Sequence, residues 1–340
     1  MNGHEVVSLY RLGSPPVEDG ERHRISVPLP PALYGSVPSE IAFCALAARA
    51  LARLHRRRPF DVVHLHGDFP EAWLGGFCST RLGLPTVMTI HGALSPRWAG
   101  TLGRAVKALD AVICVGENIR DQLVAVGTTQ DKLHVISSGV DVEGVRAAGR
   151  APPSGSDGMG RPLIVAAGAL DRVKGYDTLL SSFSIVRNRH PNATVVIAGD
   201  GRERLRLQRE ATEGAMLIGS RPRREVWSWL GTADVVVIPS RELPGKAEGV
   251  PTVLLEALAA GTRVVATCTG GMPGVLGDDI GSLAAPDDAR VLAAAILDAV
   301  SQGPPTPAER ARIEAAAASR DWKPVTAQVT EVLATSRRWQ

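Results

Sequence analysis

Short runs of apolar, mostly β-branched residues alternate along this chain with longer segments in which apolar residues recur every three or four positions. The short runs lie at residues 5–10, 24–29, 61–66, 86–91, 110–115, 133–137, 163–167, 194–198, 216–218, 234–239 and 263–267. The longer segments predict helices, among them 39–58, 175–189, 223–232 and 253–260. Nearly continuous apolar runs are typical of strands buried on both faces, and strands separated by helices form βαβ units. The pattern therefore predicts an α/β protein with mostly parallel sheets.

One segment interrupts this alternation. Residues 150–161 (RAPPSGSDGMGR) are rich in Pro, Gly and Ser and have no apolar period, which is typical of a linker. We expect two Rossmann-like domains that face each other, at residues 1–150 and 162–310, joined by a linker at 151–161. A helical tail at 311–340 is expected to pack back on the N-terminal domain. In such folds a ligand binds at the carboxyl ends of the strands, here in the cleft between the domains.

Composition and charge exclude several classes of protein. The chain has 340 residues, of which 44% are hydrophobic and 21% charged, so it has enough apolar surface for sizeable cores and is not disordered as a whole. A formal net charge of +3 is too small to indicate a nucleic-acid partner. No apolar run reaches the roughly 18 residues of a membrane-spanning helix, and the N-terminus does not resemble a signal peptide.

The cysteines indicate a reducing compartment. Cys44, Cys78, Cys114 and Cys268 form no CxxC pair, and each lies in an apolar or small-residue stretch. That setting is usual for a buried free thiol. We therefore expect a cytoplasmic protein without disulfide bonds.

Several motifs for other chemistries are missing or incomplete. The chain has no P-loop, no GxSxG elbow and no HExxH, and its one GxGxxG fragment is broken. His64 and His66 lie two residues apart on a predicted strand and could share a metal, but no third ligand is evident, which favours a structural role. The cations at 53–58 suit the C-terminal end of a helix dipole, with association with a membrane surface as the alternative.

The segment 248–261 (EGVPTVLLEALAAG) carries the strongest candidate site. Pro251 is suited to the first turn of a helix, which places Glu248 in the loop before the helix and Glu256 inside it. The backbone N–H groups near Thr252 and Val253 are then free donors at the positive end of the helix dipole, which is a ready phosphate site. Both carboxylates could accept hydrogen bonds from hydroxyl groups. Because apolar residues flank Glu256, we expect it to be buried rather than exposed.

A second candidate is the loop 168–175 (GALDRVKG), which follows a predicted strand. Gly168 turns the chain out of the strand, and Arg172 and Lys174 then stand near the start of the next helix. Cations are unfavourable at that end of a helix, so they suit a bound diphosphate better than the helix itself. Two solvated loop cations remain the alternative reading.

These segments together resemble the retaining glycosyltransferases of the GT-B fold, glycosyltransferase family four. The resemblance rests on the order and spacing of the segments 60–67 (FDVVHLHG), 85–92 (PTVMTIHG), 109–117 (LDAVICVGE), 135–141 (VISSGVD), 168–175, 198–201 (AGDG), 233–240 (ADVVVIPS), 248–261, 264–271 (VVATCTGG) and 321–322. It implies a nucleotide-sugar donor in the C-terminal domain and an acceptor in the N-terminal one.

The resemblance also implies roles for individual residues. Arg172 and Lys174 would hold the diphosphate, Glu248 would face the sugar hydroxyls and Glu256 the ribose hydroxyls. His91 would lie near the donor sugar, with a structural strand-end histidine as the alternative, and the base would stack near Gly219 and Arg221. The expected donor-binding set is Gly168, Arg172, Lys174, Gly219, Arg221, Glu248, Thr252, Val253 and Glu256, and the expected catalytic set is Glu248, His91, Lys174 and Arg172.

The chemistry that follows is metal-independent. No Asp-x-Asp metal site is visible, and the two loop cations with the helix N-terminus can replace a metal. The donor phosphate would take the acceptor proton during front-face attack. No cofactor is expected, because the nucleotide sugar, with UDP favoured, is a co-substrate. The acceptor stays open; the residues expected on its side are Phe69, Trp73, 94–98 and 242–247.

Relatives usually carry Arg where this chain has Ala169, so the expected diphosphate clamp rests on the two remaining loop cations. Residues 3–9 resemble the second strand of the family fold, so the N-terminal domain is expected to lack its first strand and helix, and activity to be impaired. An alternative is a start codon further upstream. Two other functions stay open: a catalytically silent homologue that keeps the donor site and serves as a partner subunit, and a nucleotide-sugar epimerase of the same fold.

Overall fold

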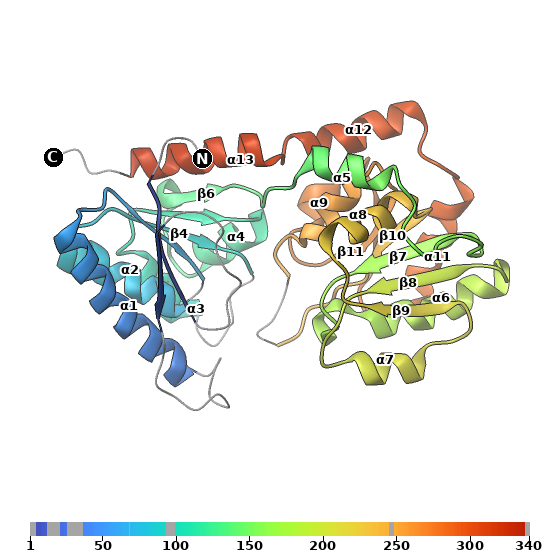
Figure 1. The fold of residues 1–340 in the computed structure, drawn as a ribbon, viewed down its shortest axis with the longest axis horizontal. Helices are drawn as coiled ribbons and strands as arrows, with labels where there is room; N and C mark the ends of the chain where they lie inside the picture. The colour runs from blue at the N-terminus through green and yellow to red at the C-terminus, as the bar shows by residue number, and fades with distance from the viewer. Residues whose placement is uncertain are drawn as a thin grey trace.

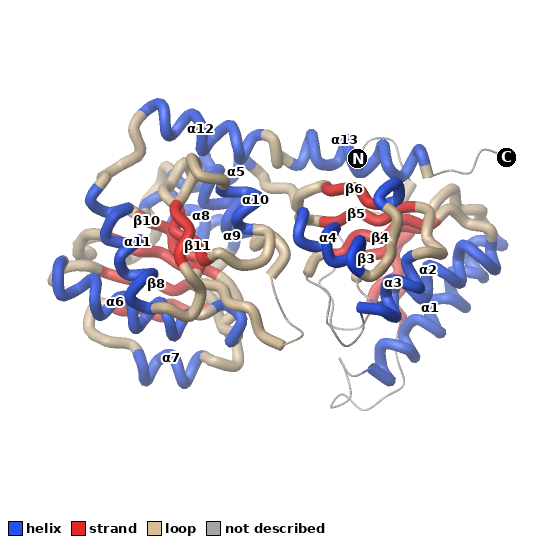
Figure 2. Tube along the Cα trace, turned by 180° about the vertical axis from the view of Figure 1, so that it is seen from behind, coloured by secondary structure: helices blue, strands red, loops and turns tan. Residues whose placement is uncertain are grey.

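The chain folds into two α/β halves that lie side by side, with two consecutive helices running along the top of both (Figure 1). A computed structural model describes residues 5–11, 21–25, 37–67, 69–92, 99–244 and 248–336. Each half has its own parallel sheet, and the two sheets are seen as separate groups of strands from behind (Figure 2). The predicted α/β class with parallel sheets is confirmed.

The first half is built on a four-stranded sheet of order β3-β4-β5-β6. Its strands are β3 (Val63–His66), β4 (Thr86–Ile90), β5 (Ala111–Cys114) and β6 (Leu133–Val135). Its helices are α1 (Val37–Arg57), α2 (Phe69–Leu82), α3 (Ala99–Val106) and α4 (Glu117–Ala125), and a short turn of 3₁₀ helix spans Gln130–Lys132. All five residues of β4 are buried, as its continuous apolar run predicts.

Two further strands of this half form a small parallel sheet of their own. β1 (Val7–Arg11) pairs with β2 (Glu21–Ile25), and neither pairs with β3. The strand expected at 24–29 therefore begins earlier, at Glu21, and residues 26–29 lie outside the described part of the chain. Within the described residues β3 is an edge strand. The expected loss of a first strand and helix stays a prediction.

The second half is built on a six-stranded parallel sheet of order β12-β11-β10-β7-β8-β9. The strands are β7 (Leu163–Ala167), β8 (Thr194–Ala198), β9 (Ala215–Gly219), β10 (Val235–Ile238), β11 (Val264–Thr267) and β12 (Ser282–Ala284). Chain order runs outward in both directions from β7, so the switch point lies between β7 and β10. In sheets of this kind the ligand site lies outside the carboxyl ends of the strands at that point.

Helices cover both faces of this second sheet. They are α6 (Tyr176–Arg189), α7 (Arg204–Glu210), α8 (Arg223–Thr232), α9 (Thr252–Ala259), α10 (Met272–Leu276), α11 (Ala289–Ser301) and α12 (Pro307–Ala318), with a 3₁₀ turn at Arg172–Lys174. Alternate strand residues feed two cores: Ile164 packs with α6 and α11, and Val165 packs with α8 and α9. This two-sided burial explains why the strands read as unbroken apolar runs.

The chain passes between the halves twice, and the two passages lie side by side. Val140 forms a parallel bridge with Asp321: its N–H donates to the Arg320 carbonyl, and its carbonyl accepts from the Trp322 N–H. A Cβ on Gly139 would lie 2.3 Å from the Trp322 ring, so only glycine lets the indole rest on this backbone.

After each passage the chain forms a helix that packs on the half it has just entered. α5 (Val142–Gly149) precedes the predicted linker yet packs against α8 and α9, where Val142 and Val145 join the second core. α13 (Trp322–Thr335) lies against the first sheet, where Val325 and Val332 are buried beside strand residues. The boundary at 150 therefore separates α5 from the sequence it packs with.

One cysteine differs from expectation. Cys44, Cys78 and Cys114 are buried free thiols, whereas Cys268 is exposed. Cys268 directly follows β11, where the chain leaves the sheet. The buried apolar run of β11 therefore ends before Cys268. Burial raises the pKa of Cys78 and of Cys114 to about 12, so neither thiol ionises at neutral pH. Among the described helices, none is long and apolar enough to cross a membrane.

Candidate functional site

A pocket of about 340 Å³ opens at the carboxyl ends of β7, β8 and β9. The loops after these strands and the first residues of α9 line it, and six of the residues predicted from sequence are among them: Gly168, Lys174, Arg221, Thr252, Val253 and Glu256. The pocket therefore lies where the strand order predicts a ligand site, and it gathers segments that are far apart in the chain.

The N-terminus of α9 opens onto this pocket without a side-chain cap. Pro251 is the N-cap residue, one position earlier than the first-turn place expected for it, and it offers no side-chain acceptor. Thr252 and Val253 line the pocket, so the unpaired N–H groups and the positive dipole end of the helix face its contents. This arrangement suits a phosphate group.

Lys174 and Glu248 meet although 74 positions separate them. Lys174 Nζ donates to Glu248 Oε2 at 3.0 Å, and the two side chains are only 20% and 14% exposed. Lys174 is held at the end of the 3₁₀ turn, where the Asp171 carboxylate accepts a hydrogen bond from the Val173 N–H. A cation and a carboxylate from two separate motifs thus form one charged pair beside the pocket.

Arg241 also contacts this turn, although no motif of the sequence includes it. Its side chain is nearly buried, and its guanidinium donates to both carboxylate oxygens of Asp177 at 2.6 and 3.1 Å and to the Thr178 hydroxyl at 2.6 Å. The Arg241 Nε lies 2.7 Å from the Asp287 carboxylate, and the Arg241 backbone N–H donates to the Val173 carbonyl. The Arg241 guanidinium thus pairs with the carboxylates of Asp177 and Asp287, while the Arg241 backbone N–H holds Val173, the residue before Lys174.

Glu256 is buried inside α9 at 7% exposure, as its apolar neighbours predict. Arg223, at the start of α8, donates to Glu256 Oε1 at 3.0 Å, and its guanidinium lies 5.1 Å from the centre of the Trp227 ring. Arg223 also lines the pocket and was missed, because nothing in its local sequence distinguishes it from other surface arginines. The ion pair holds the Glu256 side chain at the pocket wall.

Three histidines stand in a row at the ends of β3 and β4. His64 Nε2 lies 2.8 Å from Thr89 Oγ1, the rings of His64 and His66 are 4.3 Å apart, and His66 Nδ1 lies 3.0 Å from His91 Nε2. Burial, with repulsion from the neighbouring rings, lowers the pKa of His64 to about 3 and that of His66 to about 4; burial also lowers the pKa of His91. All three rings are therefore neutral at neutral pH.

His91 also contacts the other half of the molecule. A Cβ on Gly249 would lie 2.3 Å from the His91 carbonyl oxygen, so the two backbones are in direct contact. Glu248 directly precedes Gly249. The end of β4 therefore lies next to the loop that carries Glu248 and, through it, next to the Lys174–Glu248 pair. His91, Lys174 and Glu248, predicted together, thus lie at the junction of the two halves.

Other predicted residues stand apart from the pocket. Arg172 is exposed and does not line it, and Gly219 precedes the lining residue Ser220 without contributing to the wall. Trp73 is 64% exposed on α2, while 94–98 and 245–247 of the expected acceptor side lie outside the described residues. The diphosphate, base and acceptor roles of these residues stay predictions. Among the described residues no cluster of three or more His, Cys, Asp or Glu could hold a metal ion.

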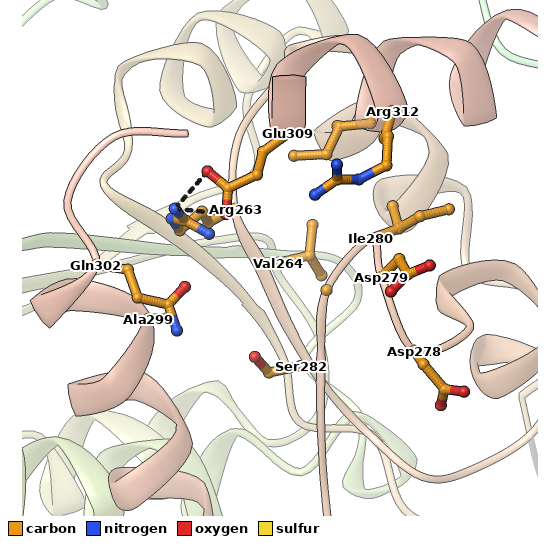
Figure 3. A pocket seen from close by; sticks show the side chains of 12 residues that line it. Arg263, Val264, Asp278, Asp279, Ile280, Ser282, Ala299, Gln302, Glu309 and Arg312 are labelled. Atoms are coloured by element: carbon orange, nitrogen blue, oxygen red, sulfur yellow. Dashed lines mark hydrogen bonds and ion pairs between the residues drawn. The ribbon is translucent and has the colours of Figure 1, made fainter. Parts of the chain in front are cut away.

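A second pocket, of about 270 Å³, lies elsewhere in the second half, between the β11–β12 edge, α11 and α12 (Figure 3). At one side Arg263 donates to both carboxylate oxygens of Glu309, at 3.2 and 3.1 Å. Asp278, Asp279 and Arg312 line it as well. None of the residues predicted from sequence lies in it.

Comparison with solved structures assigns the fold. The chain superposes on Anabaena Alr3699/HepE in complex with UDP and glucose with a TM-score of 0.73 at 20% identity, covering 93% of this chain and 86% of that one. It superposes on sucrose-phosphate synthase from Thermosynechococcus elongatus with a TM-score of 0.77 at 19% identity, covering 98% and 89%. Two facing parallel α/β halves with these neighbours define the GT-B glycosyltransferase fold.

Sequence comparison then assigns the family. The profile described as Glycosyltransferase Family 4 matches residues 1–143, and that described as Glycosyl transferases group 1 matches residues 153–320. A phosphatidyl-myo-inositol mannosyltransferase from Propionibacterium freudenreichii is 32% identical over 285 residues (79% of this chain, 69% of the relative). A glycogen synthase from Mycobacterium tuberculosis is 28% identical over 306 residues (82% and 69%). The chain belongs to glycosyltransferase family 4.

Proposed function

We propose that this chain is a retaining glycosyltransferase that moves a sugar from a UDP-sugar to an acceptor bound against the first half, without a metal ion. The observation that carries the proposal is the pocket beside β7. An uncapped helix N-terminus, a Lys174–Glu248 pair and a buried Glu256 meet there around a volume of about 340 Å³.

Each of these groups suits one part of a nucleotide sugar. The diphosphate fits the N–H groups of Thr252 and Val253 with Lys174 at its side. The Glu256 carboxylate, held by Arg223, can accept hydrogen bonds from the two ribose hydroxyls. Glu248 can accept from hydroxyls of the sugar while its charge stays paired with Lys174.

The transfer step needs positive potential where the leaving group develops charge. The bond between the anomeric carbon and the diphosphate oxygen breaks, and that oxygen takes the electron pair. Lys174 and the α9 N-terminus stabilise the resulting charge, which supports a reaction without a metal. The acceptor hydroxyl attacks from the same face and passes its proton to the departing phosphate oxygen, so the configuration at the anomeric carbon is kept.

Uridine is favoured as the base because the structural neighbours include Anabaena HepE solved with UDP and with UDP-glucose. We propose no particular acceptor, because the names of the sequence relatives indicate different acceptors: one is a glycogen synthase and another a phosphatidyl-myo-inositol mannosyltransferase.

The test is a donor panel. UDP-, GDP- and ADP-sugars are incubated with the purified chain in EDTA, and release of the nucleoside diphosphate is measured with and without a panel of sugar, inositol and lipid acceptors. Release of UDP with an α-linked product by proton NMR supports the proposal. Donor binding without release indicates a catalytically silent homologue, and interconversion of nucleotide sugars without release indicates an epimerase; either result overturns it.

A further inference from the structure

We propose that His66 is a positioning residue for His91: its hydrogen bond fixes the His91 ring and its tautomer at the junction of the two halves, so that Nδ1 is the ring atom left to meet a donor-sugar hydroxyl. The inference rests on the proposed function, because it needs a donor sugar bound near His91, where the family resemblance places it. It concerns a residue to which neither the motifs nor the proposed mechanism gives a role.

The register of β3 and β4 brings the two rings together. His66 pairs with Thr89, so it stands two positions before His91 on the neighbouring strand. The rings are stacked with 5.3 Å between centroids and 18° between planes, and His66 Nδ1 lies 3.0 Å from His91 Nε2. That hydrogen bond occupies Nε2, and His91 Nδ1 has no partner among the described residues.

The row is anchored at its inner end. His64 lies on the same face of β3 as His66, is less exposed, and its Nε2 is hydrogen bonded to Thr89 Oγ1 at 2.8 Å. Its ring lies 4.3 Å from that of His66. The His66 ring thus lies between the anchored His64 ring and the His91 ring. This placement restricts the rotation of the His66 and His91 side chains.

Neutral rings couple their tautomers. Each neutral imidazole carries one N–H, so one nitrogen of the His66–His91 bond donates and the other accepts. If His66 Nδ1 donates, the proton of His91 sits on Nδ1 and can be donated to a hydroxyl; if His91 Nε2 donates, Nδ1 is an acceptor. In both cases His66 decides which role Nδ1 has, and without His66 both tautomers are accessible.

The position of His91 makes this orientation matter for transfer. Its carbonyl touches Gly249, next to the Lys174–Glu248 pair, and His91 directly follows the end of β4. A ring that is free to turn there would meet the sugar in the correct geometry for only part of the time. Misplacing a catalytic contact by about 1 Å can cost up to about 100-fold in rate.

The experiment compares His66→Leu with His66→Asn, whose side-chain amide can donate from near the place of Nδ1. We expect kcat to fall about 10- to 100-fold in His66→Leu with the donor KM changed less than about twofold, and His66→Asn to recover most of the loss. His134→Leu, at a partly buried histidine on β6 of the same sheet, is the matched control and keeps the wild-type kcat. Circular dichroism checks that each variant is folded.

A double-mutant cycle tests the route through His91. In a His91→Ala background, His66→Leu should cause no further loss, because the group it positions is gone. Additive losses, an unchanged kcat in His66→Leu, or no rescue by His66→Asn would overturn the inference. If the wild-type chain turns over no donor, the proposed function fails, and long-range proton–nitrogen NMR of histidine-labelled protein decides the inference alone. We expect a single tautomer of His91 in the wild type and a mixture in His66→Leu; identical spectra refute it.

Discussion

Acid should destabilise the first half through His64, and the structure gives the size of the effect. Burial and the charges that would form on His66 and His91 lower the pKa of His64 to about 3 from its ordinary value of 6.5. Between pH 6.5 and about 3 the unfolded chain therefore binds a proton at His64 that the folded chain does not bind. The free energy of unfolding decreases as the pH drops below 6.5. Each pH unit costs about 1.4 kcal/mol, so at pH 5 this single group costs about 2 kcal/mol.

His66 adds less than its pKa of about 4 would suggest, because its residue surface is exposed and water stabilises its charge. The variant that isolates the effect is His64→Gln. The Gln amide nitrogen can replace Nε2 in the bond to Thr89 but cannot take up a proton. We expect the variant to be close to the wild type in stability at pH 7.5 and about 2 kcal/mol more stable at pH 5.

Urea titrations at both pH values, read by hydrogen exchange of peptides that cover β4 and β5, measure the unfolding free energy of the first half separately from the second. Peptides from β7 and β8 serve as the internal control and should show the same pH dependence in both proteins. If wild type and His64→Gln lose the same free energy in β4 and β5 between pH 7.5 and pH 5, the reasoning is refuted.

Three further predictions concern the site. Lys174→Ala and Glu248→Ala should each lower turnover about 100-fold, equivalent to about 3 kcal/mol in the barrier, while circular dichroism stays unchanged; near-normal turnover in either would remove that residue from the site. Turnover should persist in EDTA, and a loss that magnesium or manganese restores would show that a metal takes part. Gly249→Ala should lower kcat about tenfold, because the new Cβ would displace the His91 backbone; a wild-type kcat would mean that this contact has no role.

The elements of the fold could be predicted because their signals are local. The helix at 223–232 matches α8 residue for residue, and the strand at 163–167 matches β7. The same holds for the burial of Glu256, since three or four neighbours along α9 fix the face on which it lies. Among the described strands β12 was missed, because Ser282–Ala284 contains no run of apolar β-branched residues.

The candidate site was predictable as a set of segments and not as a set of contacts. Glu248 and Lys174 each stood out within a motif, but their pairing joins loops 74 positions apart. Arg223 and Arg241 act through partners on other elements, and no pattern in their own segments separates them from the many arginines of the surface. His66 was noticed beside His64, while its bond to His91 depends on the register between two strands.

The exchange of α5 and α13 between the halves sets the order in which the protein can be completed during synthesis. The second half has all its core segments, including α5, once residue 318 has left the ribosome, because α12 ends there. The first half, although made earlier, keeps Val87 and Ile113 uncovered until α13 follows. Its nascent form therefore presents an apolar sheet face for the time needed to translate some two hundred codons, as chains emerge at about 5–20 residues per second. The half that is translated first is thus the half that is finished last.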